Sequence, residues 1–132
     1  MRLKENTVII TGGNGGIGES IAAACAEEGA NVVIVGRNAE KNEKVLSRLK
    51  GIAGGEPMAI KADLNNEDEI KGFVETATKK YGRIDTLVNN AGVFLARPFT
   101  DYSPEELEQA LAVNLAGFFH VTQRVLRHML QQ

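Results

Sequence analysis

Five glycines lie within the seven residues from Gly12 to Gly18, and this cluster constrains the fold more than any other part of the sequence. The apolar run 8–10 precedes the cluster, and a stretch with helical periodicity follows it over 17–28. A continuous apolar run that ends in glycines is typical of a strand buried on both faces. A glycine loop between such a strand and a helix lets a phosphate group approach the backbone, where the helix N-terminus offers free N–H groups. The sequence therefore predicts a nucleotide phosphate site here.

The glycines can be aligned in three ways, which are G-x-G-x-x-G at Gly13, Gly15 and Gly18, G-x-x-x-G-x-G at Gly12, Gly16 and Gly18, and a P-loop-like pattern over 13–20. In the third alignment Glu19 occupies the position of the P-loop lysine. A carboxylate there would repel the phosphates that the lysine contacts, so a nucleoside triphosphatase is disfavoured. A glycine turn without a ligand is the remaining alternative, although so many glycines carry a large conformational cost on folding.

Apolar runs of strand length alternate with amphipathic helical stretches along the whole chain. The predicted strands are 8–10, 32–35, 57–60 and 84–88, and the predicted helices are 17–28, 39–50, 66–81 and 104–130. Such alternation favours a parallel sheet with helices on both faces, joined by right-handed crossovers. We therefore expect a Rossmann-type doubly wound α/β domain over residues 1–132, with strand order 3-2-1-4 and the ligand outside the carboxyl ends of the strands.

The composition excludes several other classes of protein. Fifteen Lys and Arg against 17 Asp and Glu give a net charge of −2, so the chain lacks the basic excess that nucleic-acid binding requires. The single cysteine, Cys25, excludes an internal disulfide and a cysteine-based metal cage, and we expect no metal site. No apolar run approaches the roughly 18 residues of a membrane span. We expect a cytoplasmic protein that does not contact membranes.

The end of the second predicted strand bears on which dinucleotide is bound. An acidic residue about 20 positions after the glycine loop would accept the ribose 2′-hydroxyl of NAD. This chain instead reads Val35-Gly36-Arg37-Asn38, with Arg37 placed to pair with a 2′-phosphate through its planar guanidinium. We therefore expect NADP(H) to be preferred over NAD(H). The alternative is that Arg37 is a solvated residue at the start of a helix.

Four segments together resemble the short-chain dehydrogenase/reductase family. They are Thr11-Gly12-x-x-x-Gly16-Ile17-Gly18, Ala62-Asp63-Leu64, Asn89-Asn90-Ala91-Gly92 and Asn114. The resemblance runs from the first predicted strand to the last residue and covers the N-terminal portion of the family's pattern. It implies an NAD(P)(H)-dependent oxidoreductase that transfers a hydride between the nicotinamide and an alcohol or carbonyl substrate. It also selects the alignment at Gly12, Gly16 and Gly18.

The resemblance implies roles for individual residues. Asp63 and Leu64 would border the adenine, and the backbone carbonyl of Asn114 would hold a water molecule in the catalytic proton relay. The complete set of predicted cofactor-binding residues is Thr11, Gly12, Asn14, Gly16, Ile17, Gly18, Arg37, Asp63, Leu64, Asn90, Ala91 and Gly92. Judged from the residues alone, Asp63 and Asn90 could also be turn formers, and Asn114 could make a purely structural hydrogen bond.

The acid–base residues of the family do not occur in this chain. In the family a Tyr-x-x-x-Lys pair with an upstream Ser lies beyond the fourth strand, and the lysine lowers the pKa of the tyrosine. Here Tyr81 is followed four residues later by Asp85, and Tyr102 by Glu106. We therefore expect a truncated domain that lacks its C-terminal strands, binds cofactor and is inactive alone. The alternative is a non-catalytic module that binds nucleotides or forms dimers.

The last predicted helix is apolar on more than one face. Residues 111–121 contain no charged side chain apart from the titratable His120. A helix that is apolar on several faces is expected to be buried on several sides. The corresponding helix commonly forms a dimer interface in the family, so we expect a homo-oligomer assembled through the helix at about 104–130.

Overall fold

In the computed structural model, which describes residues 1–52 and 54–132, strands and helices alternate along the chain. The strands are β1 (Thr7–Thr11), β2 (Asn31–Gly36), β3 (Met58–Lys61) and β4 (Thr86–Asn89). The α-helices are α1 (Gly16–Glu27), α2 (Ala39–Lys50), α3 (Glu67–Tyr81), α4 (Pro104–Leu111) and α5 (Phe118–Met129). A 3₁₀ turn, η1 (Phe99–Asp101), precedes α4, and a π-helical segment, η2 (Ala112–Gly117), joins α4 to α5.

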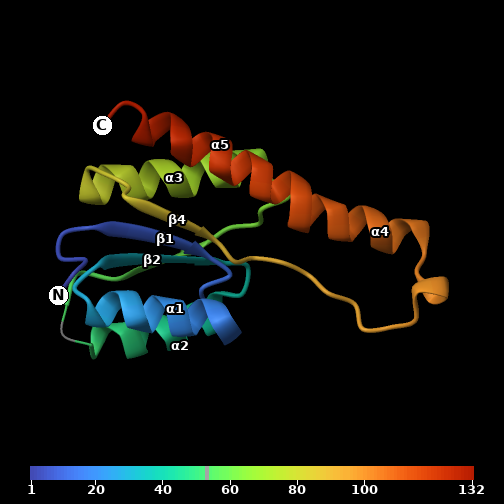
Figure 1. Cartoon of the computed structure of the whole chain (residues 1–132), viewed down its shortest axis with the longest axis horizontal. Coiled ribbons are helices and arrows are strands. Elements are labelled where there is room, and N and C mark those ends of the chain that lie inside the picture. Colours follow the sequence, from blue (N-terminus) through green and yellow to red (C-terminus); the bar gives the residue numbers. More distant parts are fainter. Residues whose placement is uncertain (53) are drawn as a thin grey trace.

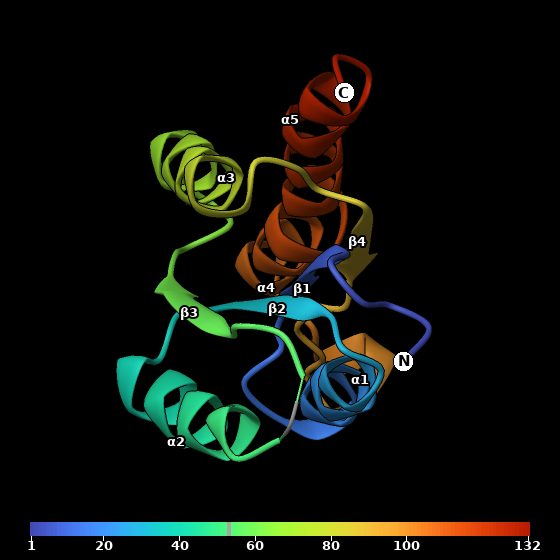
Figure 2. The same cartoon turned by 90° about the vertical axis from the view of Figure 1, so that its left-hand side faces the viewer.

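The four strands form one parallel sheet in the order β3-β2-β1-β4, which confirms the predicted topology. Helices α1 and α2 cover one face of the sheet, and α3 and α5 cover the other (Figures 1 and 2). In a doubly wound sheet the strand order reverses at β1, with β2 and β3 on one side of it and β4 on the other. This switch point opens a crevice at the carboxyl ends of the strands.

Burial on both faces explains why the central strands are continuous apolar runs. Val8 and Ile10 of β1 pack with α1 and α2, whereas Ile9 belongs to the cluster formed with α3 and α5. All three side chains are at most 1% exposed. Because alternate residues of a strand point to opposite faces, a polar residue in this run would be buried on one side or the other.

Local signals in the sequence set the helix ends. Helix α2 spans the predicted residues, and Asn66 caps α3 by accepting hydrogen bonds from the backbone N–H groups of Asp68 and Glu69. The second half of a capping box is not formed there, since the Glu69 carboxylate accepts from the Asp63 N–H instead. The capping box at α4 is complete, with the Ser103 hydroxyl accepting from the N–H of Glu106 and the Glu106 carboxylate accepting from that of Ser103.

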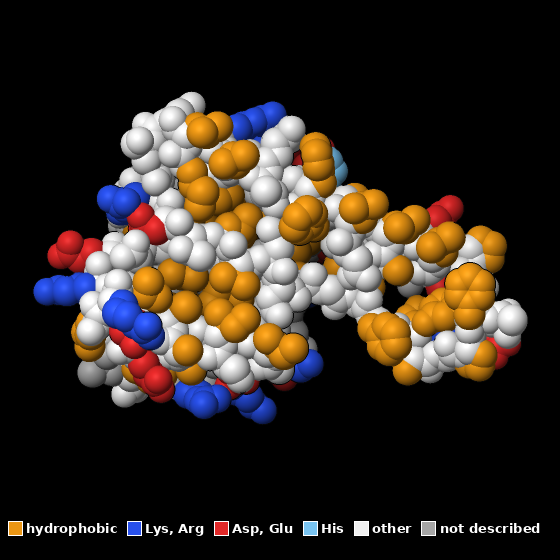
Figure 3. Space-filling view, in the orientation of Figure 1, with side chains coloured by type: hydrophobic (Ala, Val, Ile, Leu, Met, Phe, Trp, Pro, Cys, Tyr) orange, Lys and Arg blue, Asp and Glu red, His pale blue; other side chains and the backbone are white. Residues whose placement is uncertain are grey.

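The last helix differs from the prediction in one respect. The single α-helix expected over 104–130 is interrupted by the π-helical segment η2, in which the hydrogen-bond pattern changes from i→i+4 to i→i+5. Helix α4, together with the segment that follows β4, extends away from the sheet (Figure 1). Hydrophobic side chains cover this extension (Figure 3), and the large exposed ones include Phe94, Phe99, Leu111, Leu115, Phe118 and Phe119. Among the described residues, no helix is both long and apolar enough to cross a membrane.

Candidate nucleotide-binding site

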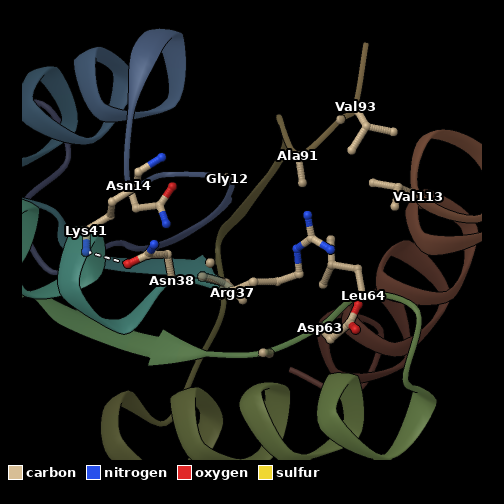
Figure 4. A pocket seen from close by; sticks show the side chains of 14 residues that line it. Gly12, Asn14, Arg37, Asn38, Lys41, Asp63, Leu64, Ala91, Val93 and Val113 are labelled. Atoms are coloured by element: carbon tan, nitrogen blue, oxygen red, sulfur yellow. Dashed lines mark hydrogen bonds between the residues drawn. The ribbon is translucent and has the colours of Figure 1, made fainter. Parts of the chain in front are cut away.

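A cavity of about 650 Å³ opens at the carboxyl ends of the strands. Four segments that follow β1, β2, β3 and β4 line it, together with Val113 of η2 (Figure 4). Seven of the twelve predicted cofactor residues are part of its wall, namely Gly12, Asn14, Arg37, Asp63, Leu64, Ala91 and Gly92. Of the other five, Thr11 and Asn90 directly precede wall residues, and Gly16, Ile17 and Gly18 lie just after Asn14 at the start of α1. The topology thus brings residues as far apart in the sequence as Gly12 and Val113 into one place.

The glycine loop places backbone amides at the edge of this cavity. Gly16 has a φ of +55°, which disfavours any residue with a side chain, and no atom lies within 4 Å of where its Cβ would be. Gly18 is tightly packed, since a Cβ there would lie 2.3 Å from the Gly12 carbonyl oxygen. Within the described chain, no side chain caps the first N–H groups of α1. These amides and the positive end of the helix dipole can therefore bind an anion.

Two polar side chains connect the glycine loop to the segment after β4. The Thr11 hydroxyl oxygen accepts from the backbone N–H groups of Asn90 (3.2 Å) and Ala91 (3.1 Å). The Asn90 side-chain amide donates to the Gly12 carbonyl oxygen at 3.0 Å. These hydrogen bonds join the glycine loop to the segment after β4, and Gly12 and Ala91 of these two segments line the cavity.

Two cations and one carboxylate contribute to the wall on the side of β2 and β3. Arg37 extends across the cavity toward Leu64, and Lys41 lies beside Asn14 (Figure 4). Neither cation forms an ion pair within residues 1–52 and 54–132. Asp63 lines the cavity and also accepts from the N–H of Asn65 at 2.9 Å, so it is both a turn former and a wall residue.

Asn42 is a polar residue next to the site that the sequence analysis did not single out. It lies in α2 on the same buried face as Val45 and Leu49 and is only 3% exposed. Its side-chain amide bonds to Gly36 and Asn14, which both line the cavity. An asparagine within the apolar stripe of a helix is the signal that could have identified it, because buried amides need partners.

Asn114 lies in η2, and its side chain is fully engaged with the segment that follows β4. Its Oδ1 accepts from the Val93 N–H and its Nδ2 donates to the Val93 carbonyl oxygen, both at 2.8 Å. A Cβ on Gly92 would lie 3.1 Å from the Asn114 Oδ1, so a glycine suits this close approach. The side chain of Asn114 is thus occupied by the backbone of Val93.

The two tyrosines lie away from the cavity wall. The Tyr81 hydroxyl donates to the Glu56 carbonyl oxygen at 2.7 Å, and burial followed by the charge of Glu56 raises the pKa of Tyr81 to about 12. The Tyr102 hydroxyl donates to the carbonyl oxygen of Leu95. In the described part of the chain, no group of three or more His, Cys, Asp or Glu side chains could hold a metal ion.

Comparisons with known proteins agree on one family. The model of the short chain dehydrogenase family matches residues 6–132. An uncharacterized oxidoreductase of Staphylococcus aureus (strain USA300) is 34% identical over 130 residues, which are 98% of this chain and 55% of that protein. The chain thus spans about half the length of the curated relatives it matches.

Solved structures show the same relationship. The chain is similar to an NAD⁺-bound xylitol dehydrogenase, with a TM-score of 0.93, 32% identity, and coverage of 100% of this chain and 51% of that one. It is also similar to a short chain dehydrogenase from Burkholderia cenocepacia J2315 in complex with NADP, with a TM-score of 0.89, 31% identity, and coverage of 98% and 53%.

Proposed function

The chain belongs to the short-chain dehydrogenase family, and on that basis we propose that it is the dinucleotide-binding portion of an NAD(P)(H)-dependent oxidoreductase. The whole enzyme would transfer a hydride between the nicotinamide and an alcohol or carbonyl substrate. The observation that carries the proposal is the cavity at the carboxyl ends of the strands, whose wall is formed by the loops that follow all four of them.

The residues around the cavity fit a dinucleotide. The open space at Gly16 and the uncapped amides of α1 suit a pyrophosphate. Asp63 and Leu64 would border the adenine, and Ala91 and Gly92 would lie along the rest of the cofactor. The remaining members of the proposed set support these contacts or take part in them, namely Thr11, Gly12, Asn14, Ile17, Gly18, Arg37 and Asn90. When bound, the dinucleotide supplies the hydride donor or acceptor.

We propose that NADP(H) is preferred over NAD(H). Arg37 and Lys41 contribute two positive charges to the wall near the end of β2, and the position after Gly36 carries no carboxylate that would accept a ribose hydroxyl. A 2′-phosphate would be stabilised by the guanidinium of Arg37 through charge-assisted hydrogen bonds.

Fluorescence titration with NADPH and NADH tests this preference. We expect tighter binding of NADPH, and Arg37→Asp should reverse the order. Arg127→Asp, at an exposed position of α5 away from the cavity, is the matched control and should leave the ratio unchanged. Equal affinities in the wild-type chain would contradict the preference.

We propose that this chain alone does not catalyse the reaction, and that Asn114 contributes to catalysis only in the whole enzyme. The two tyrosines are engaged by backbone carbonyl oxygens, and neither is followed four positions later by a lysine. The Asn114 carbonyl would hold a water molecule in a proton relay, since its side chain is occupied by Val93. Reduction of NADP⁺ by the purified chain in the presence of alcohols would disprove this.

A second proposal concerns the apolar surface of the last helix. Leu111, Leu115 and Phe119 of α4, η2 and α5 line an open groove of about 490 Å³ and are all exposed. We propose that this surface, within 104–130, pairs with a second copy of the chain, which would also suit a non-catalytic, dimerising module. Light scattering of the wild type and of Leu115→Glu tests it, and a monomeric wild type would contradict it.

A further inference from the structure

Three loops of the candidate site meet at one buried amide, that of Asn42. This side chain lies behind the wall of the cavity and is not one of the residues proposed to bind the cofactor. Its Nδ2 donates to the Gly36 carbonyl oxygen at 3.1 Å and approaches the Ile60 carbonyl oxygen at 3.5 Å. Its Oδ1 accepts from the Asn14 Nδ2 at 3.0 Å. One side chain of α2 therefore connects the ends of β2 and β3 to the glycine loop.

The directions of these hydrogen bonds determine the orientation of both amides. The partners of Asn42 on the strand side are carbonyl oxygens, which only accept, so its NH₂ group must face them. Its oxygen must then face Asn14, and Asn14 must present its own NH₂ group in return. The Oδ1 of Asn14, which forms no hydrogen bond within the described residues, is thereby left as an acceptor on the side of the cavity, where Asn14 is part of the wall.

The backbone around the pair is shaped to admit it. A Cβ at Gly36 would lie 2.3 Å from the Asn14 Nδ2 and 2.7 Å from the Asn42 Oδ1. Both distances are shorter than any that a real Cβ tolerates, so a side chain at Gly36 would separate the two amides. Gly36 immediately precedes Arg37. The hydrogen bond from Asn42 to the Gly36 carbonyl oxygen therefore also holds the backbone from which the Arg37 side chain extends into the cavity.

We propose that Asn42 is a positioning residue for the bound dinucleotide. Without contacting the ligand, it orients Asn14 so that the Asn14 Oδ1 accepts a hydrogen bond from a hydroxyl of the adenosine ribose. The amide oxygen requires a hydrogen-bond donor, which an ionised phosphate oxygen does not offer. The adenosine ribose carries such a hydroxyl beside the 2′-phosphate proposed for Arg37, and Asn14 and Arg37 line the same cavity. This inference rests on the proposed function, since it requires that the cavity binds a dinucleotide.

The test is a double-mutant cycle on the full chain, with dissociation constants of NADPH measured by fluorescence at a temperature where circular dichroism shows every variant folded. Asn42→Leu keeps the branched shape of the side chain but removes its hydrogen-bonding atoms. In the wild-type background it should weaken NADPH binding about three- to tenfold, the size expected for one hydrogen bond that fixes a binding group. In the Asn14→Ala background the same change should have less than about a twofold effect, because Asn42 acts through Asn14.

Two further variants separate positioning from folding. Asn31→Ala is the control, because the Asn31 side-chain oxygen also holds a neighbouring segment, accepting from the backbone N–H of Glu56 at 2.9 Å, but at the opposite end of β2 from the cavity. It should lower the melting temperature without changing the dissociation constant. Gly36→Ala separates Asn14 from Asn42 by another route. It should reproduce the loss of affinity in the wild-type background but not in the Asn14→Ala background, which keeps the test decisive if Asn42→Leu does not fold.

The outcomes distinguish the two proposals. If the wild-type chain binds NADPH, but Asn42→Leu weakens binding equally with and without Asn14, the positioning role is refuted and the proposed function stands. If Asn42→Leu lowers stability but leaves the dissociation constant of NADPH unchanged, the positioning role is refuted as well. If the wild type binds neither NADPH nor NADH, the proposed function itself fails, and the positioning role fails with it.

Discussion

Replacing Gly18 by alanine should destabilise the chain, although this replacement normally strengthens a helix. A Cβ at Gly18 would lie 2.3 Å from the Gly12 carbonyl oxygen and 2.4 Å from the Asn90 Nδ2, which are themselves hydrogen-bonded. Overpacking of this kind costs about 1–3 kcal/mol, and loss of the Asn90–Gly12 hydrogen bond adds about 0.5–1.5 kcal/mol. Helix propensity returns about 1 kcal/mol, so we expect a net loss of about 0.5–3.5 kcal/mol in the free energy of unfolding.

The matched control is Gly72→Ala in the middle of α3. No atom lies within 4 Å of a Cβ at Gly72, so only the helix propensity changes and the chain should gain about 1 kcal/mol. Urea denaturation followed by circular dichroism measures both values, with an unchanged m-value as the check on two-state behaviour. For a chain of 132 residues, 1 kcal/mol corresponds to a shift of about 4 °C in the melting temperature. If Gly18→Ala stabilised the chain as Gly72→Ala does, the close approach of loop and helix would be refuted.

Three further changes test the packing around the site. Burial and a nearby carboxylate raise the pKa of Tyr81 from 10.0 to about 12. The stability contributed by its neutral phenol is therefore complete below pH 10 and is lost as the pH rises from 10 to 12. In thermal melts over this range, the stability of the wild type should fall more steeply than that of Tyr81→Phe. Gln132→Ala removes two hydrogen bonds to the backbone of Ile84, at 2.7 and 2.9 Å, and should cost about 1–3 kcal/mol in urea titrations, whereas the exposed Gln131→Ala should cost almost nothing. Ser103→Ala removes the N-cap of α4 and should cost about 1 kcal/mol of stability and helical signal, which Ser103→Asp should restore.

The order of the strands was predictable because each signal for it is local. Glycines end the first two predicted strands, and the apolar runs are buried on both faces, so the alternation of strands and helices could be read directly. The parallel crossovers then leave few topologies open. The same reasoning located the carboxyl ends of the strands, where seven of the predicted cofactor residues line the cavity.

The π-helical segment and the role of Asn42 could not be predicted in this way. A change from i→i+4 to i→i+5 bonding leaves the apolar periodicity of a helix nearly unchanged, and here it coincides with the pairing of Asn114 with Val93, a contact between distant segments. Asn42 lies in the apolar stripe of a helix, where an asparagine indicates that its amide has a hydrogen-bond partner but does not identify that partner. Its partners come from three different loops, and only the assembled sheet brings them together.

Short polar side chains explain how four separate loops can form one pocket. Thr11 binds the backbone after β4, Asn90 binds the glycine loop, Asn42 binds the end of β2, and Asn114 binds Val93. Each of these bonds joins a side chain to the main chain of another segment, so the fold itself supplies contacts that hold the wall of the pocket. A ligand that binds ordered loops does not have to offset their conformational entropy. Loss of any one of these bonds should therefore weaken dinucleotide binding even where the sheet itself remains intact.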